Sequence, residues 1–281
     1  MAQVRNNYIG TYRQLKMLRQ GKTCQIWEAM RDSDHGRCVL KVLRADHRHD
    51  RDELGMLKHE YAVAKELHHK NCIQIFEFDI VRGVPFLALE YFDSLNLKQW
   101  IREPNADRDW LPGIITQASE GIAHLHQQGW IHRDLKPDNL LVNSEAQVKL
   151  IDFAIAQRPR RGLGRLWGGR GRVQGTRSYM SPEQIRNETL DARSDLYSLG
   201  CVVYELVGGK PPFTGANADE LLQRHLKAPI PSLLAVSDSV SEEFSELVAR
   251  TMAKRREERP GSMNEFLALF RKIRVPFSRR R

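Results

Sequence analysis

Cysteine is scarce in this sequence, and its few copies show no pairing pattern. Only four cysteines occur among the 281 residues. They form no C-x-x-C motif and follow no regular spacing, which argues against a disulfide framework and against a thiolate zinc site. Unpaired cysteines are typical of a reducing compartment. The four are Cys24, Cys38, Cys72 and Cys201.

Long hydrophobic runs are also missing. The most apolar window, residues 196–209, is too short to span a bilayer and contains Glu205. The N-terminal residues lack the apolar core of a secretory signal peptide. Together with the cysteine pattern, these absences lead us to expect a cytoplasmic protein.

The histidines show no metal-ligand spacing, and the sequence contains no specific nucleic-acid motif. The histidines within 45–50 and 68–69 lack supporting acids or cysteines at metal-binding spacing. The formal net charge of +9 is concentrated in residues 158–172 and 271–281. A solvated loop and a frayed chain end explain this excess, and an acidic phospholipid surface or nucleic acid is the alternative explanation.

The periodicity predicts a small β-rich part followed by a larger helical part. Residues 37–43 alternate as a strand that carries Lys41, and residues 52–69 have helical spacing. Glu60 falls on the apolar face of that helix, where a carboxylate needs a partner. Short apolar runs predict strands at 73–78 and 84–92, and helical patterns follow at 112–129 and 194–209. The fold class expected is α+β, as one domain of two lobes.

A predicted hairpin brings polar groups together near the middle of the chain. Residues 140–142 and 147–151 form two short apolar runs around a polar turn. The hairpin makes Asn139 and Asp152 neighbours, with Asp134 and Lys136 one short loop away. Carboxylate and amide oxygens are ligands that Mg²⁺ prefers, so the pattern indicates a magnesium site beside a base and a cation.

These residues resemble the protein kinase family. The run HRDLKPDN, residues 132–139, is similar to the catalytic loop of that family at every position. The resemblance implies that Asp134 accepts the proton of the attacking hydroxyl and that Lys136 stabilises charge on the transferring phosphoryl group. It implies further that Asn139 and Asp152 hold Mg²⁺, with Mn²⁺ as an alternative ion. Lysine at position 136 is typical of Ser/Thr kinases.

The resemblance also assigns a bilobal fold and a nucleotide site. Lys41 matches the lysine that contacts the α- and β-phosphates of ATP, and Glu60 matches its partner on helix C. The implied organisation is a single kinase domain over 1–281, with an N-lobe at 12–92 ending in the hinge, a C-lobe at 93–270 and a basic tail at 271–281. The other implied ATP-binding positions are Leu18, Gly21, Ile26, Val39, the gatekeeper Leu89, the hinge residues Glu90 and Phe92, Leu97 and Leu141.

Several later positions match the end of a kinase activation segment and the helix after it. Thr176 matches the residue that positions the substrate, and residues 181–183 carry Ser where the family usually has Ala. Asp195 matches the aspartate that opens helix F, and Arg259 matches the arginine that pairs with Glu183. The sequence of residues 191–213 is most similar to that of bacterial Hanks-type Ser/Thr kinases.

The glycine-rich loop departs from the family pattern. The triplet Gly21–Lys22–Thr23 is not a Walker A loop, because the first glycine of that motif would fall on Lys16. Aligned as a kinase loop, the three glycine positions hold Arg19, Gly21 and Cys24. Side chains there hinder the approach of backbone N–H groups to the phosphates. Ala154 also replaces the glycine of the D-F-G motif.

The function expected is Mg²⁺-dependent transfer of the γ-phosphate of ATP to Ser or Thr hydroxyls of proteins. One alternative is a pseudokinase that binds nucleotide or a partner without turnover, which the altered glycine loop and Ala154 favour. Another is a kinase-like enzyme acting on a small molecule. The match at residues 181–183 and Asp195, which shape a protein-substrate platform in the family, weighs against this second alternative.

The predicted activation segment has no residue for the usual activating phosphate. Residues 155–174 include no Ser, Thr or Tyr, but six arginines and no acidic residue. Because these arginines and Arg133 repel one another, we expect an acidic partner or an anionic surface at this segment, or phosphate on Thr176, Ser178 or Tyr179 just beyond it. The sequence gives no indication of the oligomeric state.

Overall fold

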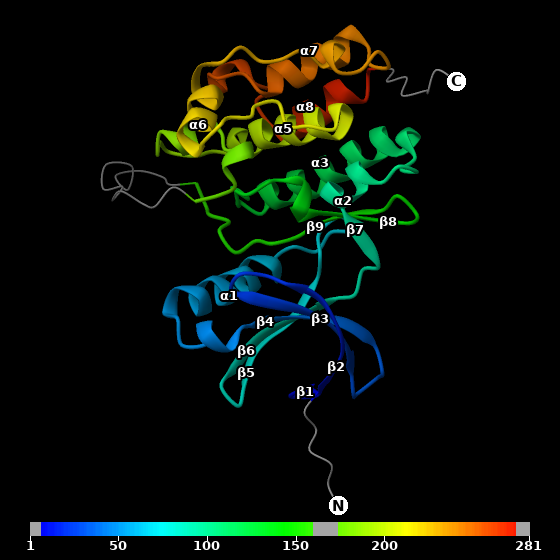
Figure 1. Ribbon diagram of the computed structural model, residues 1–281, viewed down its shortest axis with the longest axis vertical. Helices are drawn as coiled ribbons and strands as arrows, with labels where there is room; N and C mark the ends of the chain where they lie inside the picture. The colour runs from blue at the N-terminus through cyan, green and yellow to red at the C-terminus, as the bar shows by residue number, and fades with distance from the viewer. Residues whose placement is uncertain (1–6, 160–173, 274–281) are drawn as a thin grey trace, which may run out of the picture. The chain divides into compact units, whose positions relative to one another are not determined.

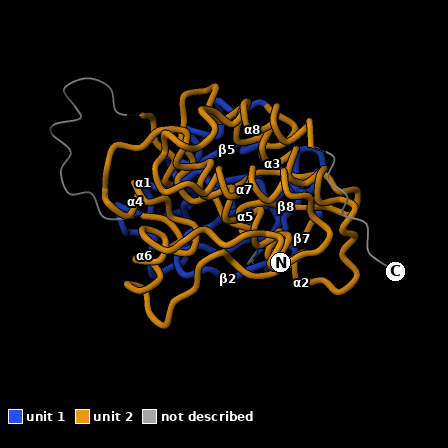
Figure 2. Tube along the Cα trace, turned by 90° about the horizontal axis from the view of Figure 1, so that it is seen from above, with its two compact units in different colours: residues 1–68, 73–93, 152–154 blue, residues 69–72, 94–151, 155–281 orange. Residues whose placement is uncertain are grey.

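The computed structural model describes residues 7–159 and 174–273 of the chain. The chain forms two compact units. Each unit includes one short segment that lies, in the sequence, within the part of the chain that forms the other unit. Figure 2 shows the units in different colours. Unit 1 consists of residues 1–68, 73–93 and 152–154, and unit 2 of residues 69–72, 94–151 and 155–281.

Unit 1 is an antiparallel sheet with one α-helix. The six strands lie in the order β1-β2-β3-β4-β6-β5, and the helix α1 (Arg51–Ala64) contacts β5 and β6 (Figure 1). The predicted strand over 37–43 is confirmed as β4, whereas the run at 84–92 is a strand, β6, only as far as Glu90, and the run at 73–78 becomes a strand only from Ile75. The strands are β1 (Tyr8–Ile9), β2 (Tyr12–Gln20), β3 (Cys24–Arg31), β4 (Arg37–Leu43), β5 (Ile75–Val81) and β6 (Val84–Glu90).

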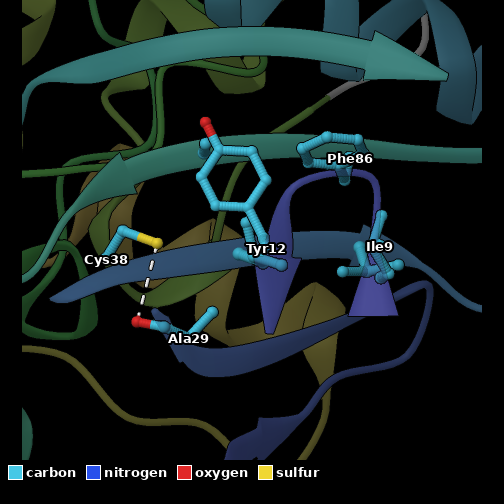
Figure 3. Packing of buried hydrophobic residues seen from close by; sticks show 8 residues of the cluster. Ile9, Tyr12, Ala29, Cys38 and Phe86 are labelled. Carbon is cyan, nitrogen blue, oxygen red and sulfur yellow. Dashed lines mark hydrogen bonds between the residues drawn. The ribbon is translucent and has the colours of Figure 1, made fainter. Parts of the chain in front are cut away.

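One face of β4 belongs to a buried apolar cluster, and this fixes where Lys41 lies. Cys38, Leu40 and Val42 alternate along the strand and are all buried. Since successive side chains of a strand point to opposite faces, Lys41 lies on the other face of the sheet. Figure 3 shows part of the cluster, in which the Tyr12 ring meets the edge of Phe86 with centroids 5.7 Å apart.

The helix α1 is shorter than the sequence predicts. It begins after Asp50, whose carboxylate accepts hydrogen bonds from two backbone N–H groups of the first turn. The expected end at residue 69 is wrong, since the helix ends at Ala64. The backbone N–H of Lys65 bonds to two carbonyls, and tight turns continue through Leu67. Asn71, further along the chain, belongs to unit 2, where its carbonyl accepts from Leu150 N–H at 2.8 Å.

Unit 2 is mainly helical and contains a small three-stranded sheet of order β7-β8-β9. The helix α5 packs against α3 and α7, and α3 also contacts α8 (Figure 1). In the described part of the chain, no helix has the length and apolar character needed to cross a membrane. The elements are β7 (Ser94–Asn96), α2 (Leu97–Arg102), α3 (Leu111–Gln127), β8 (Leu140–Asn143), β9 (Val148–Leu150), α4 (Pro182–Ile185), α5 (Arg193–Gly208), α6 (Ala218–Lys227), α7 (Glu242–Thr251) and α8 (Met263–Phe270).

The predicted hairpin and the two predicted long helices are present in unit 2. β8 pairs with β9 in antiparallel register, with Leu140 opposite Leu150. The helical patterns at 112–129 and 194–209 correspond to α3 and α5, and Pro112 lies in the first turn of α3, where a missing N–H costs nothing. The α+β fold class is therefore confirmed, with a sheet-rich first unit and a helical second unit.

Candidate active site

An ion-paired lysine forms the polar centre of unit 1. The Nζ of Lys41 lies 2.7 Å from Glu60 Oε2 and 3.1 Å from Asp152 Oδ1. β4 supplies the lysine and α1 supplies Glu60, which is 2% exposed. The structure thus contains the partner that the sequence demands for the carboxylate on the buried face of α1. Asp152 joins them from the short segment 152–154.

The charges of this group depend on one another. Burial alone would lower the pKa of Lys41, but the carboxylates of Asp152 and Glu60 raise it above its ordinary value, so the amine is a permanent cation. Burial raises the pKa of Glu60 to about 7, against the attraction of Lys41. The group therefore places one cation beside two carboxylates on the same face of the sheet as α1.

In unit 2, the Asp134 carboxylate receives hydrogen bonds on both oxygens. Oδ1 accepts from Thr176 N–H and from Thr176 Oγ1, each at 2.8 Å. Oδ2 accepts from Lys136 Nζ at 2.5 Å and from Asn139 Nδ2 at 3.3 Å. Lys136 also donates to Thr176 Oγ1 at 2.9 Å. These contacts bring together four of the predicted site residues and fix the orientation of the carboxylate.

The backbone before Asp134 is held by α5. Asp195 Oδ1 accepts from the backbone N–H of Arg133 at 2.9 Å, and its Oδ2 accepts from that of His132 at 2.7 Å. The Nε2 of His126 lies 2.8 Å from the same Oδ2. Although burial opposes ionisation of Asp195, these donors lower its pKa below the ordinary value. An ionised, fully buried carboxylate therefore holds the loop that carries Asp134.

The end of the β8–β9 hairpin positions the predicted metal ligands. The backbone N–H of Ile151 donates to the Asn139 carbonyl at 3.0 Å, and Asp152 follows Ile151 in the chain. Asn139 uses its amide nitrogen on Asp134, which leaves the side-chain oxygen as its acceptor for a ligand. The Asp152 side chain is 36% exposed. Carboxylate and amide oxygens are each ligands of the type that Mg²⁺ prefers.

The altered glycine loop forms a closed turn between β2 and β3. The N–H of Gly21 donates to the Cys24 carbonyl at 2.8 Å, and a Cβ at Gly21 would lie 2.9 Å from that oxygen. Arg44, the residue that follows β4, donates its backbone N–H to Thr23 O at 2.9 Å, and its guanidinium donates to Gly21 O at 3.4 Å. Sequence reasoning missed Arg44, because these bonds go to backbone carbonyls and leave no motif. The close approach of the Cys24 carbonyl therefore favours glycine at position 21.

The predicted adenine-binding positions differ in exposure within each unit. In unit 1, Leu18 on β2 is 46% exposed, whereas the gatekeeper Leu89 on β6 is buried. In unit 2, Leu97 is fully buried at the start of α2 and Leu141 on β8 is half-buried. The nucleotide roles of all these residues stay predictions. Ile26, Val39, Glu90 and Phe92 are each half-buried in unit 1.

The region after the predicted activation segment is anchored by a buried ion pair. Arg259 donates to both carboxylate oxygens of Glu183 at 2.7 and 2.9 Å, as the sequence predicts. Ser194 Oγ adds a bond to Glu183 at 2.8 Å. Most of the arginine-rich stretch lies outside the described residues, because these omit 160–173, so the anionic partner expected there stays a prediction.

Comparisons with known proteins agree with this arrangement. The model of the protein kinase domain matches residues 12–269. A probable serine/threonine-protein kinase PknB of Bifidobacterium longum is 30% identical over 92% of this chain and 39% of its own length. The serine/threonine-protein kinase PknB of Mycolicibacterium smegmatis is 36% identical over 78% of this chain and 36% of its own length. The serine/threonine-protein kinase PknL of Mycobacterium bovis is 33% identical over 77% of this chain and 54% of its own length.

The matches span about a third to a half of the length of these relatives. The family model, by contrast, covers nearly all of the described residues. With the catalytic-loop contacts and the Lys41–Glu60 pair in place, the chain belongs to the protein kinase family.

Proposed function

We propose that the chain transfers the γ-phosphate of ATP to Ser or Thr hydroxyls of protein substrates in a Mg²⁺-dependent reaction. The observation that carries the proposal is the Asp134 carboxylate, held on both oxygens by Lys136, Asn139 and Thr176. The names of the bacterial relatives, which are serine/threonine-protein kinases, support the same activity.

The residues of unit 2 supply the base and the charge near the acceptor hydroxyl. Asp134 is an acceptor for the hydroxyl proton, because its carboxylate is fixed in direction rather than free to rotate. Lys136, 2.5 Å from that carboxylate, carries the positive charge that stabilises the transferring phosphoryl group. Thr176, bonded to both, positions the substrate hydroxyl by holding Asp134 and Lys136 together.

The nucleotide contacts that we propose fall mainly on residues of unit 1. Lys41 contacts the phosphates, and Glu60 fixes the direction of its amine. Asn139 and Asp152 would hold Mg²⁺, or Mn²⁺ in its place. The ion, when bound, neutralises phosphate charge as it develops. The adenine contacts proposed are those of Leu18, Ile26, Val39, Leu89, Leu97 and Leu141, with Glu90 and Phe92 in the hinge and Gly21 in the loop.

A pseudokinase is the second candidate, and the closed Gly21–Cys24 turn favours it. This turn uses the Gly21 N–H within the protein, so that donor is not directed at a phosphate. Ala154 replaces a glycine in the segment that follows Asp152. The loss of one such donor costs about 10²- to 10³-fold in rate in other enzymes. That loss slows transfer without removing Lys41, Asp134 or Asp152, which is why we favour an active enzyme.

The remaining proposals concern the whole protein. We propose a single kinase domain with lobes at 12–92 and 93–270 and a basic tail at 271–281. The four free cysteines, three of them buried, support a reducing and hence cytoplasmic location. An anionic partner for residues 155–174 is proposed from charge alone.

Transfer of labelled phosphate from ATP to a generic basic protein tests the proposed function. Wild type should label the substrate, and Asp134→Asn should lose about 10³-fold or more of the rate while still binding ATP. Asp238→Asn, a matched change at an exposed position of unit 2, should keep the wild-type rate. ATP binding by wild type without any transfer would favour the pseudokinase.

A further inference from the structure

The peptide groups on either side of Arg133 are fixed by contacts from several elements. Arg133 has a φ of +71°, a left-handed conformation that side-chain-bearing residues rarely adopt. Its N–H donates to Asp195 on α5 at 2.9 Å. In the next peptide, the N–H of Asp134 lies 3.3 Å from His132 Nδ1, and the carbonyl of Arg133 accepts from Gln184 Nε2 at 2.8 Å. The two peptide groups that flank Arg133, the residue before the proposed base Asp134, are therefore both hydrogen-bonded.

Gln184 is held in place by its own helix. The short helix α4 begins with a capping box, in which Gln184 Oε1 accepts from the backbone N–H and from the Oγ of Ser181, both at 3.1 Å. Ser181 is 0% exposed and Gln184 is 6% exposed. Because the amide oxygen is used by Ser181, the amide nitrogen is directed at the Arg133 carbonyl. The side chain therefore has one orientation, fixed at both ends.

We propose that Gln184 is a positioning residue for phosphoryl transfer, acting through the Arg133 carbonyl on the direction of Asp134. The proposal rests on the proposed function. It also explains the serine at 181: an alanine there could not donate to Gln184 Oε1 through a hydroxyl, and the amide would lose part of what orients it. Ser181 and Gln184 thus link α4 to the catalytic loop, since Ser181 orients the amide that donates to the Arg133 carbonyl.

The hydrogen bond from Gln184 to the Arg133 carbonyl affects the position of the Asp134 carboxylate. A left-handed residue tends to relax when the contacts around it are lost. Relaxation at Arg133 would rotate the following peptide and shift the Asp134 carboxylate relative to Lys136 and Thr176. Displacements of about 1 Å at a reacting group can cost on the order of 10²-fold in rate. Nucleotide binding, which we assign mainly to residues of unit 1, would not change.

Two substitutions remove the donor in different ways. Gln184→Glu keeps the length and the acceptor for Ser181 but replaces the NH₂ group, and Gln184→Met removes both polar atoms. Each should lower kcat about ten- to hundredfold with the KM for ATP unchanged. The matched control is Gln99, the equivalent residue of the other capping box, on α2, which is exposed. Gln99→Glu and Gln99→Met should keep the wild-type kcat.

A pH profile separates positioning from a general loss of structure. A carboxyl at 184 is buried, so its pKa is raised, and once protonated it can donate to the Arg133 carbonyl as the amide does. The kcat of Gln184→Glu relative to wild type should therefore recover as the pH falls from 8 to 6. Gln184→Met has no proton to donate, so its ratio to wild type should stay low throughout.

Each outcome of these measurements is informative. A reduced kcat in both variants, with recovery at low pH only for Gln184→Glu, supports the proposal. Wild-type kcat in both variants overturns it while leaving the proposed function intact. A loss that is independent of pH in both variants, accompanied by a lower melting temperature, also overturns it, since the residue would then be merely structural. If wild type itself transfers no phosphate, the proposed function fails and this inference fails with it.

Discussion

Replacing Lys41 with methionine should separate the structural and chemical roles of the ion-paired group in unit 1. Lys41→Met has similar length but no charge, and it leaves Glu60 buried at 2% exposure without its 2.7 Å partner. Breaking a buried pair by removing one partner typically costs about 3–5 kcal/mol of the free energy of unfolding. Asp152 is a third exposed, so its lost contact adds little.

Urea unfolding and a transfer assay measure the two roles separately. Phosphate transfer should fall by about 10³-fold, because the phosphates lose the positive charge of Lys41. The double substitution Lys41→Met with Glu60→Gln removes the unpaired buried charge, so it should recover most of the stability and none of the activity. The stability difference between Lys41→Met and wild type should shrink at pH 5, below the pKa of about 7 for Glu60, where that carboxyl is protonated.

Two results would contradict the roles assigned to Lys41 and Glu60. Wild-type activity in Lys41→Met would show that the lysine does not contact the phosphates. Equal stability of the single and double variants would show that the burial of Glu60 does not depend on its ion pair.

Two further predictions concern the glycine loop and a buried histidine. Cys24→Gly should leave transfer intact or increase it, measured as kcat and as the KM for ATP, because it restores backbone approach to the phosphates; a sharp loss would reveal a role for the thiol. Burial lowers the pKa of His225 to about 4, so the neutral ring stabilises the fold above pH 6.5 and this contribution is lost as the pH falls. Between pH 7.5 and 4.5 the loss is about 2–3 kcal/mol of the free energy of unfolding. His225→Gln should flatten the fall in urea stability by that amount, and an unchanged slope would contradict the assignment.

Much of the site could be predicted because its residues follow local rules. Glu60 was found from helical spacing alone, as a carboxylate on a buried face that required a partner. Two apolar runs around a polar turn are enough to predict the hairpin that lies between Asn139 and Asp152 in the sequence. The Arg259–Glu183 pair came from the resemblance and not from any pattern within the chain.

The parts that sequence reasoning missed depend on contacts between distant residues. After α1 ends at Ala64, tight turns run to Leu67 and Asn71 then pairs with the distant Leu150, a contact that helical periodicity cannot show. The serine and glutamine at 181 and 184 do form a readable capping-box pattern. Their contact with the Arg133 carbonyl bridges 51 positions of sequence, and no local rule predicts it.

The exchange of short segments between the two units has a consequence for how the chain unfolds. A cut between residues 93 and 94 would not yield two complete pieces, because each would lack a segment that it needs. The N-terminal fragment would lose Asp152, a partner of Lys41, and the C-terminal fragment would lose Asn71, whose Nδ2 donates to the Val148 carbonyl at 2.8 Å. Neither sheet-rich nor helical fragment is therefore expected to be stable when expressed separately. Chemical denaturation of the intact chain should instead appear as one cooperative transition, even though two compact bodies are present.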